Sequence, residues 1–369
     1  MDWFEGFQPI SLNSIHRSSV PVSQTNSENK VHVMSSLKPE YSSYLGRHTT
    51  LAYLASKPSI WRRIPYLKDN NGRAPPIILA VGDRRRVYAL SRRLSRPVLL
   101  PEVSARLFHP RARGEDLRAA AEFGRVAMAI GSISSLPVLV VETQMGAPAT
   151  QIIMKEVLSD DLSSIEYRTV KSVFRFPNKI VIRVGTAGGI NCDGVSRIKV
   201  GDVVNATHSV GVSGAVIQSL LRLDFWQSAT IDELRRKWIS LGPNFSITRD
   251  GHPRVECSSD VVEAIDKSGS RFAKGAYCKG GNVTKDSLYA EVSSDVFLDL
   301  CRTQNCRSTE MELSAIAVAA RESHSHFGMV SGIVGLLPGA SFSESESANA
   351  AAERRSLEVA LGAVSTLAS

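Results

Sequence analysis

The 369-residue sequence lacks the features that mark disulfide-rich, zinc-binding or membrane-spanning proteins. It has five cysteines, an odd number, with no Cys-x-x-Cys pair and no histidine at the spacing of a zinc ligand. Such a set is typical of reduced thiols, so we expect a cytoplasmic protein without a metal site. No apolar run approaches the ~20 residues that cross a bilayer, and the N-terminus lacks the basic and apolar regions of a secretory signal, so no membrane association is expected.

Aromatic residues are also sparse, at 7%, although the net charge is +8 and the pI is near 9.3. The positive charge favours a nucleic acid, an anionic surface or a small anion as binding partner. The largest basic cluster holds six arginines between Arg84 and Arg96, at helical spacing and with few aromatics for base stacking. We therefore expect small anionic ligands and no nucleic acid.

Three regions differ in composition. Residues 1–45 are rich in Ser, Asn and Gln without clear periodicity, which predicts a disordered segment. Residues 46–74 are interpreted as a lead-in with a short helix and a turn. Residues 75–369 alternate apolar runs with helical periodicity, which predicts a single α/β domain whose mostly parallel sheet is covered on both faces.

Within this domain, short apolar runs predict strands and amphipathic runs predict helices. Strands are expected at 75–81, 97–100, 125–130, 137–141, 180–184, 201–207, 276–283 and 329–337. Helices are expected after Asp83 and at 150–158, 231–239, 261–268, 296–301, 310–322 and from 343 to the end. The last helix should carry Glu353, Arg354, Arg355 and Glu358 on its solvent face. The segment 218–254 gives irregular signals and is expected to form an insertion.

The segment Lys179–Ile190 is an apolar run followed by three glycines within five residues. We expect the strand to stop at Val184, which would bring Arg183, Thr186 and bare backbone to one point. Glycine lets a ligand approach the main chain, and turn N–H groups can bind an anion. Ligands of open α/β sheets lie beyond the carboxyl ends of strands. The alternative interpretation is a tight strand exit with a surface arginine.

A second strand is expected to end at Gly82, with Asp83 as the N-cap of the helix that follows. The N–H groups at such a helix start favour anions, and Arg86, one turn in, can fold back to them. Together with Arg183 and Thr186, these groups could enclose a tetrahedral dianion, because the planar guanidinium donates two parallel hydrogen bonds. By contrast, Arg84–Arg85 is expected on solvated helix surface.

A third feature is Glu310-Met311-Glu312, at the expected start of a helix. One interpretation is that a carboxylate there only complements the helix dipole, worth about 0.3–1 kcal/mol. The other is that a glutamate accepts hydrogen bonds from a vicinal diol while Met311 packs on a sugar face.

Together these motifs resemble the uridine phosphorylase branch of the trimeric/hexameric-type nucleoside phosphorylase family, over about residues 75–340. The segments that carry the resemblance are Gly82–Val87, Gln144–Thr150, Arg183–Ile190, Val200–Val203, Asp286–Tyr289 and Glu310–Glu312. The resemblance implies a three-layer αβα domain with a mixed, twisted central sheet. It also implies phosphorolysis of a ribonucleoside to the free base and ribose 1-phosphate, with inorganic phosphate as co-substrate and no metal or organic cofactor.

The resemblance further assigns site residues. The phosphate site would comprise Gly82, Arg86, Arg183 and Thr186, with Arg106 supplied by an adjacent subunit. The ribose site would comprise Glu310, Met311, Glu312 and His48. Of these, Arg183, Arg86 and Glu312 are the expected catalytic residues. The family pattern implies a homo-oligomer, a dimer or a hexamer of dimers, with active sites shared between subunits.

The base pocket departs from the pattern. Uridine phosphorylases carry Gln-x-Arg where this chain has Ala290–Ser294, and the segment Gly335–Gly339 has no ionisable group near the last strand. Lys285 and Glu291 are the nearest alternatives for a polar contact. Two other functions therefore stay open: purine nucleoside phosphorylase activity, and a non-catalytic relative that binds nucleoside or phosphate. A water-using nucleosidase fits less well, because it has no use for the phosphate arginines.

Overall fold

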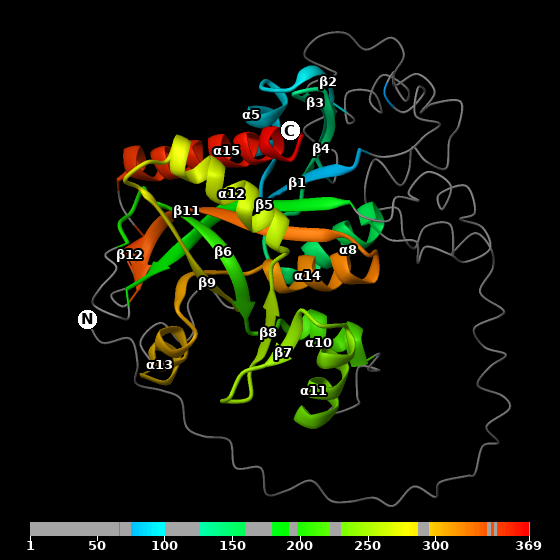
Figure 1. Cartoon of the computed structure of the whole chain (residues 1–369), viewed down its shortest axis with the longest axis vertical. Coiled ribbons are helices and arrows are strands. Elements are labelled where there is room, and N and C mark those ends of the chain that lie inside the picture. Colours follow the sequence, from blue (N-terminus) through cyan, green and yellow to red (C-terminus); the bar gives the residue numbers. More distant parts are fainter. Residues whose placement is uncertain are drawn as a thin grey trace, which may run out of the picture. The chain divides into compact units, whose positions relative to one another are not determined.

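A computed structural model of the chain describes residues 66, 75–99, 126–158, 179–191, 198–221, 230–286, 295–337, 341–342 and 345–368. They form a central sheet with helices on both faces (Figure 1). Segment 1–45 and all but one residue of 46–74 lie outside the described residues, so the division into three regions stays a prediction. No described helix has both the length and the apolar character that crossing a membrane requires.

The strands include all eight that were expected from the apolar runs, with some differences in their bounds. They are β1 (Ile77–Val81), β2 (Ser95–Leu99), β3 (Met128–Ile133), β4 (Leu136–Glu142), β5 (Ile180–Ile190), β6 (Val203–Val210), β7 (Phe245–Ile247), β8 (Pro253–Glu256), β9 (Tyr277–Thr284), β10 (Cys306–Glu310), β11 (His326–Leu337) and β12 (Ser341–Phe342). The helices are α5 (Arg84–Ser91), α8 (Ala147–Leu158), α10 (Gly214–Leu221), α11 (Ile231–Ser240), α12 (Ser259–Phe272), α13 (Asp295–Thr303), α14 (Leu313–Glu322) and α15 (Glu346–Leu367).

The sheet is mixed, as the family resemblance implied. Its order is β12-β11-β6-β9-β10-β5-β1-β4-β3-β2, and β11 also pairs with β5. Strand β5 runs parallel to β1 and β11 but antiparallel to β10. The expectation of a mostly parallel sheet holds only in part: the parallel pairings include the long β5–β11 ladder, but antiparallel pairings occur both at hairpins and within the centre of the sheet. Strands β3 and β4, for example, are joined by Ser134 and Ser135 at φ 47° and 70°, the backbone of a tight hairpin turn.

Alternate residues of β1 face the two helical layers. Ile77, Leu79 and Val81 pack in a buried cluster with residues of α5, α12 and α15. Ile78 and Ala80 belong to the cluster on the other face, which includes residues of α8 and α14. The period of two along a buried strand therefore places helices on both faces and confirms the three-layer αβα arrangement (Figure 1).

In the segment 218–254, the expected helix at 231–239 is present as α11, but the described part around it is regular and not irregular as expected. This part contains the end of α10, then α11, β7 and β8, and β8 extends the sheet by pairing with β6. Helix α11 has a capping box, in which the Thr230 hydroxyl accepts from the backbone of Glu233 and the Glu233 carboxylate accepts from the backbone of Thr230. The sequence pattern did not predict these two strands, because β7 and β8 are only three and four residues long.

The closing helix α15 packs directly against β11, the longest of the described strands, at Gly332. A Cβ on Gly332 would lie 2.4 Å from the carbonyl oxygen of Ala352 and 3.0 Å from its Cβ. Backbone atoms of α15 cannot give way as a flexible side chain would. The absence of a side chain at position 332 therefore sets how closely α15 approaches the sheet.

Gly332→Ala is expected to lower the free energy of unfolding by about 1–3 kcal/mol, because the added methyl overpacks this contact. The control is Gly214→Ala in α10, where the nearest atom to the added Cβ is an Asp286 oxygen at an ordinary 3.5 Å. Chemical denaturation of both variants checks this. If Gly332→Ala were as stable as Gly214→Ala, α15 would be free to shift away from β11.

Candidate active site

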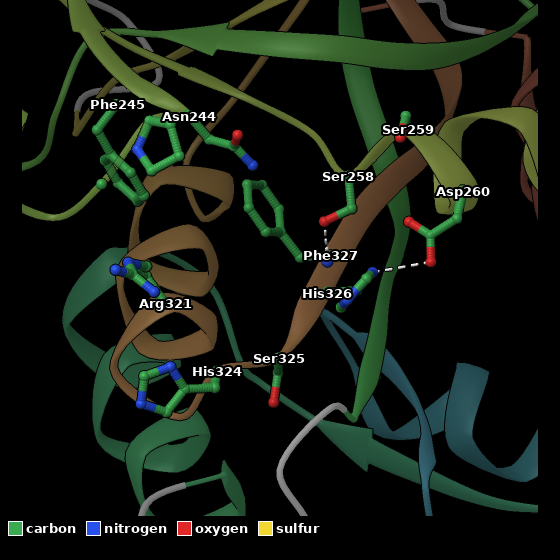
Figure 2. A pocket seen from close by; sticks show the side chains of 12 residues that line it. Asn244, Phe245, Ser258, Ser259, Asp260, Arg321, His324, Ser325, His326 and Phe327 are labelled. Atoms are coloured by element: carbon green, nitrogen blue, oxygen red, sulfur yellow. Dashed lines mark hydrogen bonds and ion pairs between the residues drawn. The ribbon is translucent and has the colours of Figure 1, made fainter.

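One cavity of about 310 Å³ lies at the start of β11, and none of the predicted site residues that the structure describes lines it. Figure 2 shows His326 beside Asp260, with Nδ1 2.8 Å from Oδ2, while His324 and Arg321 lie at its rim. His324 and His326 are both exposed, and the Ser258 hydroxyl is occupied by the backbone N–H of Phe327 at 3.0 Å. This cavity is the larger of the two described here, but the charged side chains that line it are exposed and not buried.

A second cavity, of about 230 Å³, gathers buried charged groups. It lies where β1, β5 and β10 approach the loop before α8 and the start of α14. Seven of the residues assigned by the resemblance line it: Gly82, Arg86, Arg183, Thr186, Glu310, Met311 and Glu312. Arg106 and His48 lie outside the described residues, so their assignments are untested. We take this smaller cavity as the candidate active site because of its chemistry.

Strand β5 does not end at Val184, which corrects the expectation from sequence. It continues to Ile190 through the glycines, and none of Gly185, Gly188 and Gly189 has positive φ. These glycines serve close approach instead of a turn. A Cβ on Gly185 would lie 2.5 Å from Nη1 of Arg183, and one on Gly189 would lie 2.8 Å from the Ile333 side chain. The bare stretch of strand lets the Arg183 guanidinium lie against its own backbone.

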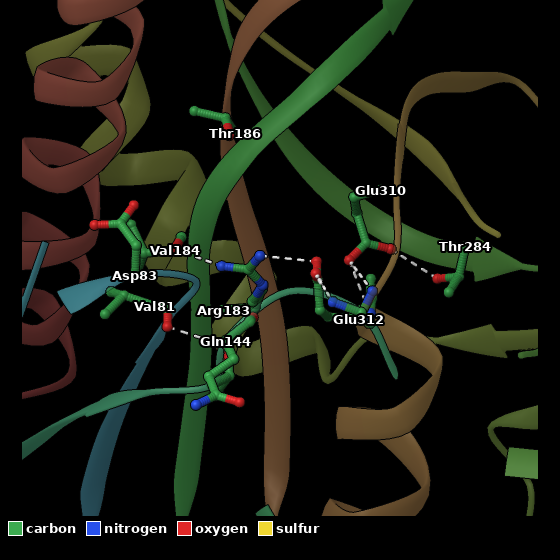
Figure 3. Close-up of polar contacts among 12 residues, drawn as sticks. Val81, Asp83, Gln144, Arg183, Val184, Thr186, Thr284, Glu310 and Glu312 are labelled. Atoms are coloured by element: carbon green, nitrogen blue, oxygen red, sulfur yellow. Dashed lines mark hydrogen bonds and ion pairs between the residues drawn. The ribbon is translucent and has the colours of Figure 1, made fainter. Parts of the chain in front are cut away.

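Arg183 forms a buried ion pair with Glu312 (Figure 3). Its Nη2 donates to Oε2 of Glu312 at 2.8 Å, and its Nη1 donates to the Val184 carbonyl at 2.7 Å. The two charged side chains are only 5% and 6% exposed. Among the described residues the Nε of Arg183 has no hydrogen-bond partner. A guanidinium has five N–H donors, so Arg183 retains donors for a ligand while it holds Glu312.

Arg86 approaches the same point from α5. A Cβ on Gly82 would lie 3.4 Å from Nη2 of Arg183 and 3.4 Å from Nη1 of Arg86, so both guanidinium groups border the space that Gly82 leaves empty. The Nη2 of Arg86 also donates to the Thr186 hydroxyl at 3.4 Å. As expected from sequence, Asp83 is the N-cap of α5, with Oδ1 accepting from the backbone N–H of Arg86 at 3.1 Å. Two cations and a hydroxyl therefore surround a small space at a helix start, which suits a tetrahedral anion.

Glu312 connects this space to the loop that precedes α8. Its Oε1 accepts from the backbone N–H of Gly146 at 2.7 Å. The loop has two residues in the left-handed region, Gln144 at φ 61° and Gly146 at φ 86°. Such backbone is uncommon for a residue with a side chain and is concentrated at functional sites. The motif Gln144–Thr150 is thus beside the other motifs, as its place in the resemblance implied.

Glu310 has a different environment from the one expected. Helix α14 begins at Leu313, not at residue 310, and Glu310 is the last residue of β10. Its Oε2 accepts from the backbone N–H groups of Glu312 and Leu313 at 2.7 and 2.9 Å. Its Oε1 accepts from the side chains of Asn282 and Thr284, both at 2.8 Å. With four donors already bound, Glu310 orders the start of α14, and its role as a ribose ligand stays a prediction.

The three charged side chains shift each other's ionisation. Burial and then the neighbouring Glu312 carboxylate raise the pKa of Glu310 to about 7. Burial opposes ionisation of Glu312, but the charge and hydrogen bond of Arg183 outweigh it and hold the pKa of Glu312 below its ordinary value. Burial would likewise lower the pKa of Arg183, and Glu312 with Glu310 raises it instead. Near neutral pH Arg183 and Glu312 are charged, while Glu310 is partly protonated.

Sequence reasoning missed several residues of the cavity wall. Met145 is 75% exposed at its mouth, and Val334 and Thr309 line it. The Thr309 hydroxyl is buried and has no hydrogen-bond partner in the described part of the chain. Its only signal in the sequence was its place next to Glu310. Arg84 was expected to be solvated but is half-buried, with Nε 3.6 Å from Oε2 of Glu142, because α5 packs over the end of β4.

A family model for the phosphorylase superfamily matches residues 97–365, which is well over half of the chain. The chain belongs to the phosphorylase superfamily. Gly82 and Arg86 precede the matched residues, so their place in the site rests on the convergence described above. Comparison with curated protein sequences gave no match.

Solved structures of this superfamily share the fold. One is a purine nucleoside phosphorylase from Toxoplasma gondii in complex with immucillin-H, 16% identical, with a TM-score of 0.51 and coverage of 80% of this chain and 92% of that one. Another is a uridine phosphorylase from Vibrio fischeri ES114 complexed with 6-hydroxy-1-naphthoic acid, 17% identical, with a TM-score of 0.50 and the same coverage. At such identities the likeness shows the fold alone.

The raised pKa of Glu310 gives a testable pH dependence. Its folded pKa of about 7 exceeds the ordinary 4.5, so the folded state binds the proton more tightly than the unfolded state. Stability from this proton is present below about pH 4.5 and is lost as the pH rises toward 7, by at most about 3 kcal/mol. Glu310→Gln, which cannot ionise, should lack this loss.

Urea denaturation of the wild type and Glu310→Gln between pH 4.5 and 8 measures the difference. Glu263→Gln, at a mostly exposed position of α12, is the control. Parallel stability curves for wild type and Glu310→Gln would contradict the raised pKa of Glu310.

Proposed function

We propose that this chain is a nucleoside phosphorylase of the uridine phosphorylase type, which transfers ribose from a nucleoside to inorganic phosphate. The observation that carries the proposal is the convergence of Arg86, Arg183 and Thr186 around Gly82, with the Glu312 carboxylate bound to the same Arg183. An anion cradle and a buried diol acceptor lie in one cavity. That combination suits a reaction between phosphate and a ribosyl group.

Phosphate would occupy the space beside Gly82. Arg86 and Arg183 are pre-formed donors, so little reorganisation accompanies binding, and the Thr186 hydroxyl can donate a further hydrogen bond. The buried position of Arg183 strengthens its interaction with an anion, because water screens it less than at the surface. This is the phosphate-binding role that the resemblance assigns to these residues.

Ribose would lie between this phosphate and Glu312. The carboxylate is ionised, and it can accept hydrogen bonds from the 2′- and 3′-hydroxyls. Met311, in the same wall, offers an apolar surface to the sugar. Because Glu312 and the phosphate both contact Arg183, the guanidinium would fix the sugar and the nucleophile relative to each other.

In the reaction, the bond from C1′ to the base nitrogen breaks and its electron pair leaves with the base. A phosphate oxygen forms the new bond to C1′, giving ribose 1-phosphate. The phosphate dianion stabilises the positive charge that develops on the ribosyl ring, so the protein contributes mainly orientation and electrostatics. The proposed chemistry uses phosphate as co-substrate and calls for no metal or organic cofactor.

Choice of base rests on few groups. The segment that replaces the uracil-reading Gln-x-Arg lies outside the described residues. Within the described wall, Val334 is apolar and Thr309 offers a free hydroxyl. A pocket with few polar contacts discriminates weakly between bases. Uridine is proposed as substrate from the motif resemblance, and purine nucleosides are the alternative.

The direct test is phosphate dependence. Uridine, inosine and adenosine are incubated with the protein with and without inorganic phosphate, and free base and ribose 1-phosphate are quantified. Turnover of at least one nucleoside only with phosphate is expected. Turnover without phosphate would indicate a hydrolase, and no turnover would support a non-catalytic relative.

Replacement of the buried arginine should be severe. Arg183→Lys keeps a charge beside Glu312 but loses the planar fork, so kcat/KM is expected to fall about 100-fold or more, as for loss of one transition-state donor. Arg85→Ala, at a side chain that is 93% exposed on α5, should leave kcat/KM within about twofold. Steady-state assays with thermal melting measure both. Similar losses in the two variants would mean that the phosphate site lies elsewhere.

A further inference from the structure

A carboxylate from the closing helix reaches the phosphate cradle. The Nε of Arg86 donates to Oε1 of Glu353 at 3.0 Å, and the two side chains are 11% and 35% exposed. Glu353 was expected on the solvent face of α15. Instead it pairs with a residue 267 positions earlier in the chain. No motif assigned it to the site.

The geometry of this contact matters because a guanidinium has distinct edges. Glu353 binds at Nε, which leaves both terminal nitrogens of Arg86 for the cavity. Nη2 lies on Thr186, and Nη1 lies 3.4 Å from Oδ2 of Asp83 and borders the space at Gly82. A carboxylate at Nε therefore restrains rotation of the group about its long axis without covering the nitrogens that would meet phosphate.

Glu353 is itself held on both sides along α15. The preceding residue, Ala352, is the one that packs against Gly332 of β11. Two residues later, Nη1 of Arg355 donates to the carbonyl of Gly201 at 2.7 Å. Glu353 thus projects from a stretch of helix that is fixed to the sheet, which makes it a rigid support for Arg86.

We propose that Glu353 is a positioning residue for the phosphate site, which holds the Arg86 guanidinium with its terminal nitrogens toward the anion. This inference rests on the proposed function. Glu353 touches neither phosphate nor nucleoside, and it acts only through Arg86. The acidic side chain therefore supports anion binding despite its own negative charge.

Two substitutions separate orientation from charge. Glu353→Ala removes the acceptor and the charge, whereas Glu353→Gln keeps an oxygen that can accept from Nε and removes only the charge. If Glu353 orients Arg86, the KM for phosphate and the Kd for inorganic phosphate should rise about fivefold in Glu353→Ala. Glu353→Gln should bind phosphate at least as tightly as the wild type, because repulsion of the dianion is removed while the hydrogen bond remains.

The experiment measures calorimetric binding of inorganic phosphate and steady-state kinetics at varied phosphate for wild type, both Glu353 variants and Glu358→Ala, a control on the same helix. At saturating phosphate, kcat of Glu353→Ala should stay within about twofold of wild type, because the effect is on phosphate binding. Thermal melting confirms that each variant is folded, and Glu353→Gln keeps the test informative if Glu353→Ala is unstable.

The outcomes are distinct. Weaker phosphate binding in Glu353→Ala with rescue in Glu353→Gln supports the positioning role. Unchanged or tighter binding in Glu353→Ala overturns it and makes Glu353 a bystander or a competitor of phosphate, and equal weakening in both variants also overturns it. A wild type that neither binds phosphate nor turns over a nucleoside overturns the proposed function as well, whereas a functional wild type with indifferent Glu353 variants overturns this inference alone.

Discussion

The buried ion pair between Arg183 and Glu312 is the contact on which the site depends. It ties β5 to the start of α14 and, through Glu312 and Gly146, to the loop before α8. Two unpaired charges at these positions would be strongly destabilising, so the pair keeps three separate segments in register. In the proposed reaction, the same pair would place the phosphate-binding arginine beside Glu312, the proposed ribose ligand. One interaction would then supply both structural integrity and the geometry of the proposed ligand site.

More carboxylates surround this pair than would be expected at a site that binds an anion. Glu310 accepts from the backbone N–H of Glu312 at the start of α14, Asp83 caps α5, and Glu353 accepts from Arg86. Each is bound to a donor that would otherwise lack a partner or a fixed direction. Their charges lower the positive potential at the proposed anion site, but they restrain the donors that would bind the anion. Preorganised donors contribute more to a reaction than a larger but mobile charge.

The sequence was sufficient to predict the three-layer class and the cluster of seven lining residues, because the motifs combine buried strands with unusual polar residues at their ends. It misjudged glycine. Gly185 and Gly189 were interpreted as the end of a strand, yet both lie within β5 and allow close approach by Arg183 and Ile333. Local patterns do not distinguish a turn from tight packing, because the partner comes from a distant segment. The contact of Glu353 was not predicted for the same reason, because its partner Arg86 lies in a distant part of the chain.

Gly185 shows what such packing implies for variation in this chain. Its neighbour in space is the guanidinium of Arg183, and any side chain there would enter the volume that this group occupies. Gly185 has no side chain that could donate, accept or carry charge, so a search for reactive side chains would pass over it. Its contribution is the absence of a side chain, which leaves room for the guanidinium. A methyl group at this position would overlap the Arg183 guanidinium and displace it. An added carbon atom here would therefore disturb the site as a lost charge would.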